Sequence, residues 1–528
     1  MASTQVLIGA AVIVTAAIAV AASDAQQPAS VSAHTSPVAG TPQGRAGDGG
    51  GRGGPGAPLY AGLCAGCHGT DVSGGRAPSL FAEKWLSATT DDRMLSTMKA
   101  GVPGTEMPAF NHLLDDQQLW QLVQYIRSEA GRLEPMPKFV ANPDGQVLTT
   151  EKQAITIDVI ARGLETPWGL AFLPDGRLLV TERPGRLRVI DKGRLSESIK
   201  GIPTVHEQQD GGLLDVEVHP QYATNGWIYL AYAEALPGFV PLPPGASQAT
   251  SASDQGRPAV PSMTIVVRGR ISGNNEWTDQ EVIFRASPAL YSPSGAHFGC
   301  RMIFDRQDHL FFTVGERGTM EDAQDLSKPT GKIHRVTDTG GVPRDNPFVN
   351  RPGALGTIWS YGHRNPEGLA WDPVTGMLWE SEHGPSGGDE INVIEPGHNY
   401  GWGVATKGMQ SGITRASEPG MDDPVVYYTP SIGPAAIAFY TATRFPAWRN
   451  TSLFVTGLVG QQLRRLEIVG TAVTHQETIF DRFGRVRDIV QGPDGYFYAA
   501  LQHPTGRGTG FNLSDSTPGI VIRLVPAK

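Results

Sequence analysis

The sequence predicts a mainly β protein, a six-bladed β-propeller preceded by a small all-α domain. Three observations predict it. A sequence pattern made of an apolar stretch, a turn and a second apolar stretch occurs six times after residue 154. A strongly patterned helix, "DDQQLWQLVQYIRSEAG", lies in the segment before these repeats. The 65 glycines and 41 prolines favour turns and short strands over long helices.

The first segment, residues 1–25, contains an apolar run from Val6 to Ala22 that is free of charge and is followed by small residues. This pattern predicts a secretory signal peptide and a periplasmic protein, although no Lys or Arg precedes the run. An uncleaved anchor is the alternative, because the run is close to the length that spans a bilayer. We expect contact with a membrane only in that case.

Composition then divides the rest of the chain into four parts. Residues 26–56 are mostly Pro, Gly, Ser, Ala and Thr, so we expect a flexible linker. Residues 57–135 form a compact helical unit that ends with the patterned helix. A Pro-rich link, residues 136–153, leads to the β-rich region at residues 154–528.

The repeated pattern has the size of a β-hairpin, and six copies indicate the radial repetition of a propeller. A β-sandwich with chance repeats is the alternative. Residues 235–262 contain a Pro/Ser-rich stretch between the second and third copies, which we expect to be a surface insertion. The copies begin at Gly169, Asp215, Arg301, Gly368, Ala436 and Asp488.

Charge and cysteine content exclude two classes of protein. The formal net charge is −9 and no Lys/Arg-rich run occurs, so nucleic acid is not an expected partner. Only three cysteines are present, which excludes a disulfide framework as the main source of stability. We expect Cys300 to be a buried thiol.

The other two cysteines belong to "LCAGCHGT". In this motif Cys67 lies three positions after Cys64, and His68 directly follows Cys67. Two thiols at this spacing can add to both vinyl groups of one haem, and the adjacent imidazole then binds the iron. Zinc would need two further soft ligands, and no second Cys pair exists in the sequence. A redox pair would need a βαβ context, which the helical unit lacks. The motif therefore predicts haem c.

A sixth ligand to the iron is expected downstream, and Met107 in "GVPGTEMPAF" lies in a loop framed by Gly and Pro. Its competitors are Met94, Met98 and Met136, of which the first two have the spacing of helix packing. The unit resembles a small class I cytochrome c domain. That resemblance implies that Cys64 and Cys67 hold the haem and that His68 and Met107 are the axial ligands.

The densest polar segment is "WSYGHRNPEGLAWDPVTGMLWESEHGPSGGDEINVIEPGHNYGW", residues 359–402. Here the chain resembles the soluble glucose and aldose sugar dehydrogenases that depend on pyrroloquinoline quinone (PQQ), the glucose/sorbosone dehydrogenase family. The resemblance covers residues 155–528. PQQ is a flat quinone with three carboxylates, so its site needs fixed cations, a divalent metal at the quinone oxygen and a base for the substrate hydroxyl.

The resemblance implies two pairs of cofactor contacts. Arg364 and Asn365 in "GHRNPEG" form the first pair. Arg485 and Arg487 in "GRVRD" form the second, and their spacing places both side chains on one face of a strand.

The same resemblance implies the metal ligands and the base. Gly384 and Pro385 in "EHGPSGGDE" match the loop whose carbonyl oxygens bind Ca²⁺, a hard cation that prefers oxygen. His297 in "SGAHFGCRM" is implied to take the proton from the anomeric hydroxyl while hydride passes to the quinone. Glu316 in "TVGERG" falls where the family has a carboxylate that orients this histidine.

Three positions depart from the family pattern. Asp210 replaces a glutamine, with Gln209 beside it, and Ser431 replaces a threonine near the cofactor; the resemblance implies that these three residues contact PQQ. Val459 stands where a lysine contacts the cofactor. These changes are compatible with weaker PQQ binding or an altered substrate. We interpret the remaining histidines of this region as structural or supporting: His334, His363, His383 and His398.

Together the two halves predict an exported quinohaemoprotein that oxidises an aldose to its lactone. Fusing haem to the dehydrogenase makes the first electron transfer intramolecular, and a further periplasmic carrier would accept the electrons. Two alternatives stay open. One is a metal-dependent lactonase on the same propeller, and the other is a non-enzymatic electron carrier whose propeller docks a partner.

Overall fold

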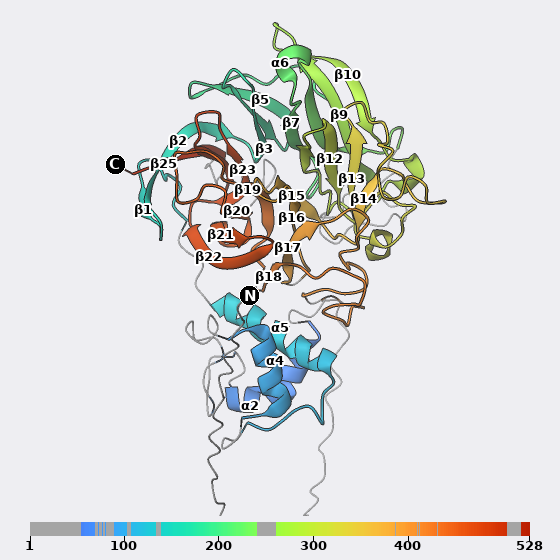
Figure 1. Cartoon of the computed structure of the whole chain (residues 1–528), viewed down its shortest axis with the longest axis vertical. Coiled ribbons are helices and arrows are strands. Elements are labelled where there is room, and N and C mark those ends of the chain that lie inside the picture. The colour runs from blue at the N-terminus through green and yellow to red at the C-terminus, as the bar shows by residue number, and fades with distance from the viewer. Residues whose placement is uncertain are drawn as a thin grey trace, which may run out of the picture. The chain divides into compact units, whose positions relative to one another are not determined.

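A computed structural model describes most of the chain (Figure 1). The expected signal segment, most of the first linker and most of the insertion at 235–262 lie outside the described residues. None of the helices in the described part combines the length and the apolar character needed to cross a membrane. The described residues are 54–68, 72, 77, 80, 89–102, 107–133, 139–239, 260–385, 387–408, 410, 412–429, 431–503 and 519–527.

The N-terminal unit is all-α, as predicted. Helix α5 begins with a capping box, because Asp115 Oδ1 accepts from the Gln118 N–H at 2.8 Å and Gln118 Oε1 accepts from the Asp115 N–H at 3.1 Å. Gly56 permits α1 to cross α5 closely, since a Cβ there would lie 2.2 Å from the Gln121 carbonyl oxygen. The helices are α1 (Gly56–Leu63), α2 (Ala65–His68), α4 (Asp91–Ala100) and α5 (Asp116–Leu133).

The rest of the described chain forms six antiparallel sheets, which are the six blades of a propeller and confirm the predicted fold. The short helices are α6 (Tyr222–Asn225), η1 (Pro288–Leu290), η2 (Met320–Ala323) and η3 (Val459–Gln461). Blade 1 is β3 (Pro167–Phe172), β4 (Leu178–Glu182), β5 (Arg186–Asp191) and β6 (Arg194–Leu195); blade 2 is β7 (Leu213–Val218), β8 (Ile228–Ala235), β9 (Ser262–Ile271) and β10 (Trp277–Phe284); blade 3 is β11 (Met302–Phe304), β12 (His309–Val314), β13 (Lys332–Thr337) and β14 (Ile358–Tyr361). Blade 4 is β15 (Pro366–Trp371), β16 (Leu378–Glu382), β17 (Asp389–Ile394) and β18 (Val426–Tyr428); blade 5 is β19 (Pro434–Phe439), β20 (Ser452–Gly457), β21 (Leu463–Val469) and β22 (Ala472–Phe480); blade 6 is β1 (Val147–Thr149), β2 (Ala154–Leu164), β23 (Arg485–Gln491), β24 (Phe497–Gln502) and β25 (Gly519–Pro526).

Each predicted repeat is the first hairpin of one blade. The first strands β3, β7, β11, β15, β19 and β23 contact their counterparts in the neighbouring blades, so they form the inner wall of the ring. Buried apolar side chains fill the space between blades, as in the β19–β20 pair, where all but one of the residues are buried. Functional side chains at the ends of the inner strands are therefore brought together at one mouth of the ring.

The sixth blade closes the ring with strands from both ends of the described propeller. Strand β2 pairs antiparallel with β25, with Ile157 opposite Leu524, while β24 and β23 continue the same sheet (Figure 1). This closure pairs β2 and β25 on both sides, because β2 lies between β1 and β25 and β25 lies between β2 and β24.

The buried His334 makes stability depend on pH. Its Nε2 lies 2.9 Å from the Pro329 carbonyl, its Nδ1 lies 3.0 Å from Thr357 Oγ1, and burial lowers its pKa from 6.5 to about 4. When the pH falls from 7 to 5, this histidine takes up a proton in the unfolded chain but stays neutral in the folded chain. Its contribution therefore lowers the free energy of unfolding by about 2 kcal/mol over this pH range. We expect His334→Gln to remove that part of the pH dependence in urea unfolding. Equal pH dependence in both proteins would contradict the assignment.

Candidate functional site

The predicted site residues lie at one end of the inner strands. His297 precedes β11, Arg364 and Asn365 precede β15, and Arg485 and Arg487 lie in β23. Because the second strand of each blade runs antiparallel to the first, the residues that follow it return to the same mouth. The site is thus assembled from several blades.

A His–carboxylate pair lies at the centre of this group. Nδ1 of His297 bonds to Oε1 of Glu316, whose side chain is only 3% exposed, whereas that of His297 is 19% exposed. Gly315 lets the two segments approach, because a Cβ at this position would lie 2.2 Å from the His297 carbonyl oxygen. Since Nδ1 is engaged, Nε2 is the ring nitrogen available to a ligand, as a general base requires.

Backbone and side-chain bonds join this pair to the next blade. The Glu316 N–H donates to the Arg364 carbonyl at 2.8 Å. Oδ1 of Asn365 accepts from the Gly299 N–H at 3.0 Å, and its Nδ2 donates to Oε1 of Glu367 at 3.1 Å. Asn365 is 1% exposed, so it ties the histidine loop rigidly to blade 4.

Four arginines form a cationic cluster around the pair: Arg183, Arg364, Arg485 and Arg487. In each, the buried Nε has no hydrogen-bond partner among the described residues. Burial lowers the pKa of Arg183 and Arg364, and burial with the neighbouring charge of Arg487 lowers that of Arg485 to about 10. A buried Nε–H group without a partner is costly until an anion accepts from it, so this cluster fits a ligand with several carboxylates.

The positive charge of Arg487 is partly neutralised by a carboxylate of the protein. Arg487 donates to Oε2 of Glu367 and lies over the ring of Trp168, with 5.3 Å between its Cζ and the ring centroid. Although burial alone would raise the pKa of Glu367, the charges of Arg487 and His383 hold it below its usual value. Glu367 is therefore an anion that fixes Arg487 in place.

The sequence prediction missed Arg183. It follows β4 directly, at the position that His383 occupies after β16, and Glu316 also follows the second strand of its blade. A comparison of the six repeats at this position would have found it. Arg183 supplies a cation to a site where Val459, 46% exposed, contributes none.

The prediction also missed Asp389, which holds two loops of the site. Its Oδ1 accepts from the Gly384 N–H at 2.9 Å, and its Oδ2 accepts from the Ser431 hydroxyl at 2.8 Å. The same Oδ2 accepts from the N–H groups of Ile432 and Gly433 at 2.7 and 2.8 Å. Asp389 is fully buried, so one carboxylate fixes both the predicted calcium loop, Gly384 and Pro385, and the loop of Ser431.

The departures from the family pattern lie in or beside the site. Oδ2 of Asp210 accepts from the His297 N–H at 3.4 Å, so the substituted residue contacts the histidine loop. Gln209 has a φ of 52° and packs against Gly295, where a Cβ would lie 2.5 Å from its Oε1. The Val459 N–H donates to the Ile432 carbonyl at 2.9 Å, next to the loop of Ser431.

Of the predicted haem residues, Cys64 lies between α1 and α2, Cys67 and His68 lie in α2, and Met107 lies in a loop after α4. The N–H groups of Cys67 and His68 both donate to the Cys64 carbonyl, at 3.1 and 2.9 Å, which places the three residues on one tight turn. Met107 packs against the apolar cluster that includes Cys64, and its carbonyl accepts from the Val102 N–H at 3.2 Å. Met94 and Met98 are buried in that cluster, which agrees with their interpretation as packing residues. Two thiols, an imidazole and a thioether on one small apolar unit fit a haem c.

Known proteins share both parts of the chain. Residues 164–510 match the family described as Glucose / Sorbosone dehydrogenase. The chain belongs to this family. Residues 52–126 match the family described as cytochrome c oxidase, cbb3-type, subunit III, and the N-terminal unit is a cytochrome c domain.

Individual relatives agree with this assignment. An aldose sugar dehydrogenase of Escherichia coli is 38% identical over 67% of this chain and 91% of its own length. The PQQ-bound structure of an aldose sugar dehydrogenase from Streptomyces coelicolor is 28% identical, has a TM-score of 0.54 and covers 73% of this chain and 99% of its own. The cytochrome c55X of Stutzerimonas stutzeri is 39% identical over 14% of this chain and 60% of its own length. The chain is thus an oxidoreductase of the sugar dehydrogenase family that carries its own cytochrome c domain.

Proposed function

We propose that this dehydrogenase oxidises an aldose at the anomeric hydroxyl to the lactone, with PQQ and Ca²⁺ as cofactors, and reduces its own haem c. The supporting observation is a set of four arginines, each with a buried and unpartnered Nε among the described residues, beside the His297–Glu316 pair and Asp210. A lactonase does not need such a cluster, whereas a cofactor with three carboxylates does.

His297 is the base in this proposal. Its Nε2 takes the proton of the anomeric hydroxyl, and Glu316 on Nδ1 stabilises the imidazolium that forms. Bound PQQ would supply the acceptor for a hydride from the anomeric carbon, so that the sugar would lose two electrons and become the lactone. Arg364, Arg485 and Arg487 would hold the cofactor carboxylates in the orientation that this transfer requires.

Calcium and haem complete the proposal. The loop of Gly384 and Pro385 would offer carbonyl oxygens to Ca²⁺, held in position by Asp389. Cys64 and Cys67 would bind the haem covalently, and His68 and Met107 would ligate its iron. The two electrons would leave one at a time through this haem to a periplasmic acceptor, because the attachment motif and the expected signal segment both indicate export.

A visible spectrum of the purified protein tests the proposal directly. The protein is loaded with PQQ and Ca²⁺, and the haem bands are recorded before and after an aldose is added. We expect the bands of reduced haem only when cofactor, calcium and sugar are all present. Reduction by dithionite but by no aldose would contradict the proposal, and release of acid from a lactone without haem reduction would favour a lactonase.

Arg183 is expected to replace the lysine that is missing at Val459. Removing one charge-assisted contact weakens binding by about 1.5–3 kcal/mol, so Arg183→Met should raise the Kd for PQQ by about 10- to 100-fold. Quenching of tryptophan fluorescence during a PQQ titration measures this change. Arg177→Met is the matched control, because Arg177 pairs with Asp175 at the surface. An unchanged Kd in Arg183→Met would remove Arg183 from the cofactor site.

A further inference from the structure

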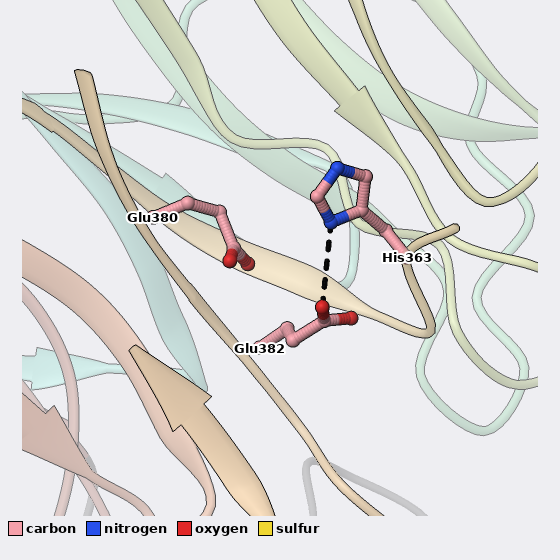
Figure 2. Close-up of side chains that lie close together, drawn as sticks. All are labelled: His363, Glu380 and Glu382. Atoms are coloured by element: carbon pink, nitrogen blue, oxygen red, sulfur yellow. Dashed lines mark hydrogen bonds and ion pairs between the residues drawn. The ribbon is translucent and has the colours of Figure 1, made fainter. Parts of the chain in front are cut away.

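A second group of potential ligands lies in blade 4, beside the site described above (Figure 2). Glu380 and Glu382 project from the same face of β16, and His363 comes from the loop before β15. One ligand atom from each of these three residues lies within 4.8 Å of the others. Their exposed fractions are 0, 3 and 0%, so all three side chains are buried.

Two acceptor atoms in this group have no hydrogen-bond partner among the described residues. They are Oε1 of Glu380 and Oδ1 of Asn392, both fully buried. The Nδ2 of Asn392 donates to Oε2 of Glu380 at 3.0 Å and to Oε2 of Glu390 at 3.3 Å. The amide nitrogen therefore satisfies one oxygen of each carboxylate, and Oε1 of Glu380 receives no donor from the described residues. Buried oxygen acceptors without donors are costly unless a proton or a cation reaches them.

No Lys or Arg of the described residues lies within ion-pair distance of Glu380, Glu382 or Glu390. The charges of Arg364 and Lys407 act on Glu382 and Glu390 only from farther away. Both basic groups have other partners, since the Arg364 guanidinium donates to the His383 carbonyl at 3.1 Å and Lys407 pairs with Asp423 at 2.8 Å. Among the described residues, the His363 imidazole is the basic group within ion-pair distance of Glu382.

The imidazole is oriented for coordination. Nε2 of His363 lies 2.9 Å from the Ser360 hydroxyl, and its ring stacks on Tyr400 with 4.8 Å between the centroids. Its Nδ1 faces Oε1 of Glu382 at 3.3 Å (Figure 2). A second partner on the far nitrogen is what fixes the orientation of metal-binding histidines.

We propose that this group binds a first-row divalent cation, such as Mn²⁺ or Zn²⁺, through His363 Nδ1 and the carboxylates of Glu380 and Glu382. Ligands at about 2.0–2.2 Å from such an ion lie at most about 4.4 Å apart, so the side chains close in by less than about 1 Å. The mixture of imidazole and carboxylate distinguishes this position from the calcium loop, because imidazole suits these metals better than Ca²⁺.

Glu382 links the proposed ion to the site described above. Glu382 lines a narrow pocket together with Arg364 and Gly384, so this carboxylate connects the buried group to that site. The other oxygen of Glu382 accepts from the Arg364 N–H, so an ion on Glu382 would stiffen the segment that positions Arg364. The inference does not rest on the proposed sugar oxidation.

Titration with Mn²⁺ tests the proposal on the full-length, haem-loaded protein. Bound metals are first removed with a chelator, and excess Ca²⁺ is then added to fill the calcium loop. Electron paramagnetic resonance of free Mn²⁺ should reveal one tight site per chain, and Zn²⁺ should displace the Mn²⁺. Glu380→Gln, which keeps the shape of the side chain, should raise the Kd by at least about tenfold.

Matched measurements separate binding from folding. Glu395→Gln removes an exposed carboxylate at the end of the same blade and should leave Mn²⁺ binding unchanged. The thermal midpoint of the unaltered protein should rise when Mn²⁺ is added, because a ligand that binds only the folded state stabilises it. Absence of a tight site, or equal affinity in Glu380→Gln, would overturn the proposal whatever the outcome of the sugar assay.

Discussion

Sugar-driven reduction of the haem should fall by about 10²- to 10⁴-fold in His297→Ala, the range that general-base catalysis contributes. The reason is geometric, because the bond to Glu316 leaves Nε2 as the only ring nitrogen that can receive the substrate proton. Stopped-flow recording of the haem band after mixing with an aldose, in protein loaded with PQQ and Ca²⁺, measures the effect.

Two controls make this result specific. Dithionite should reduce the haem of His297→Ala as fast as that of the unaltered protein, because the substitution lies outside the cytochrome c domain. His398→Ala removes a histidine that is 43% exposed and pairs with Asp422 at the surface, and it should leave the rate unchanged. A full rate in His297→Ala would assign the base to another residue.

Asp389→Ala should disrupt both cofactor loops at once. It leaves four donors, from Gly384, Ser431, Ile432 and Gly433, without their buried acceptor. The loss of these charge-assisted bonds lowers the unfolding free energy by about 4 kcal/mol and the melting temperature by about 5 °C. We also expect at least about a 100-fold weaker binding of PQQ in the presence of Ca²⁺, measured by fluorescence titration together with calorimetric melting.

Two further variants test whether these effects come from the loss of the Asp389 carboxylate. Asp389→Asn keeps the size and one acceptor oxygen, so its loss of stability and of binding should be intermediate. Asp345→Ala removes a carboxylate that is 72% exposed and should change neither quantity measurably. If Asp389→Ala melted at a lower temperature yet bound PQQ normally, the two loops would be structural and would not hold the cofactor.

The fold was accessible from the sequence because each repeat is a local hairpin. The apolar alternation of "GLAFLPDGRLLVTE" describes β3 and β4, and its recurrence identifies the inner half of every blade. The outer strands are more exposed and vary in length, as in β10 and β22, so the repeats say little about them.

The site was accessible only where a motif or a resemblance marked it. Nothing local to Asp389 distinguishes it from a surface charge, and Arg183 stands out only when the ends of the second strands are compared between repeats, because the roles of both residues depend on partners that lie far away in sequence. Arg183 belongs to a cluster with Arg487, and Asp389 binds the loop of Ser431. The buried acids Glu380 and Glu390 were missed for the same reason, since alternation along a strand does not reveal what an inward-facing carboxylate meets.

The closure of the ring by β2 and β25 also governs how the enzyme is made. Thr156 in β2 pairs with Val525 in β25, so β2 can pair with β25 only after nearly the whole polypeptide has been synthesised. Pairings of such long sequence separation form slowly. The helices of the cytochrome c domain, whose contacts are local, can fold while the ring is still open. The cytochrome c domain would therefore be complete before the dehydrogenase domain, and a nascent propeller would remain exposed to proteases and to aggregation until its last strand is synthesised.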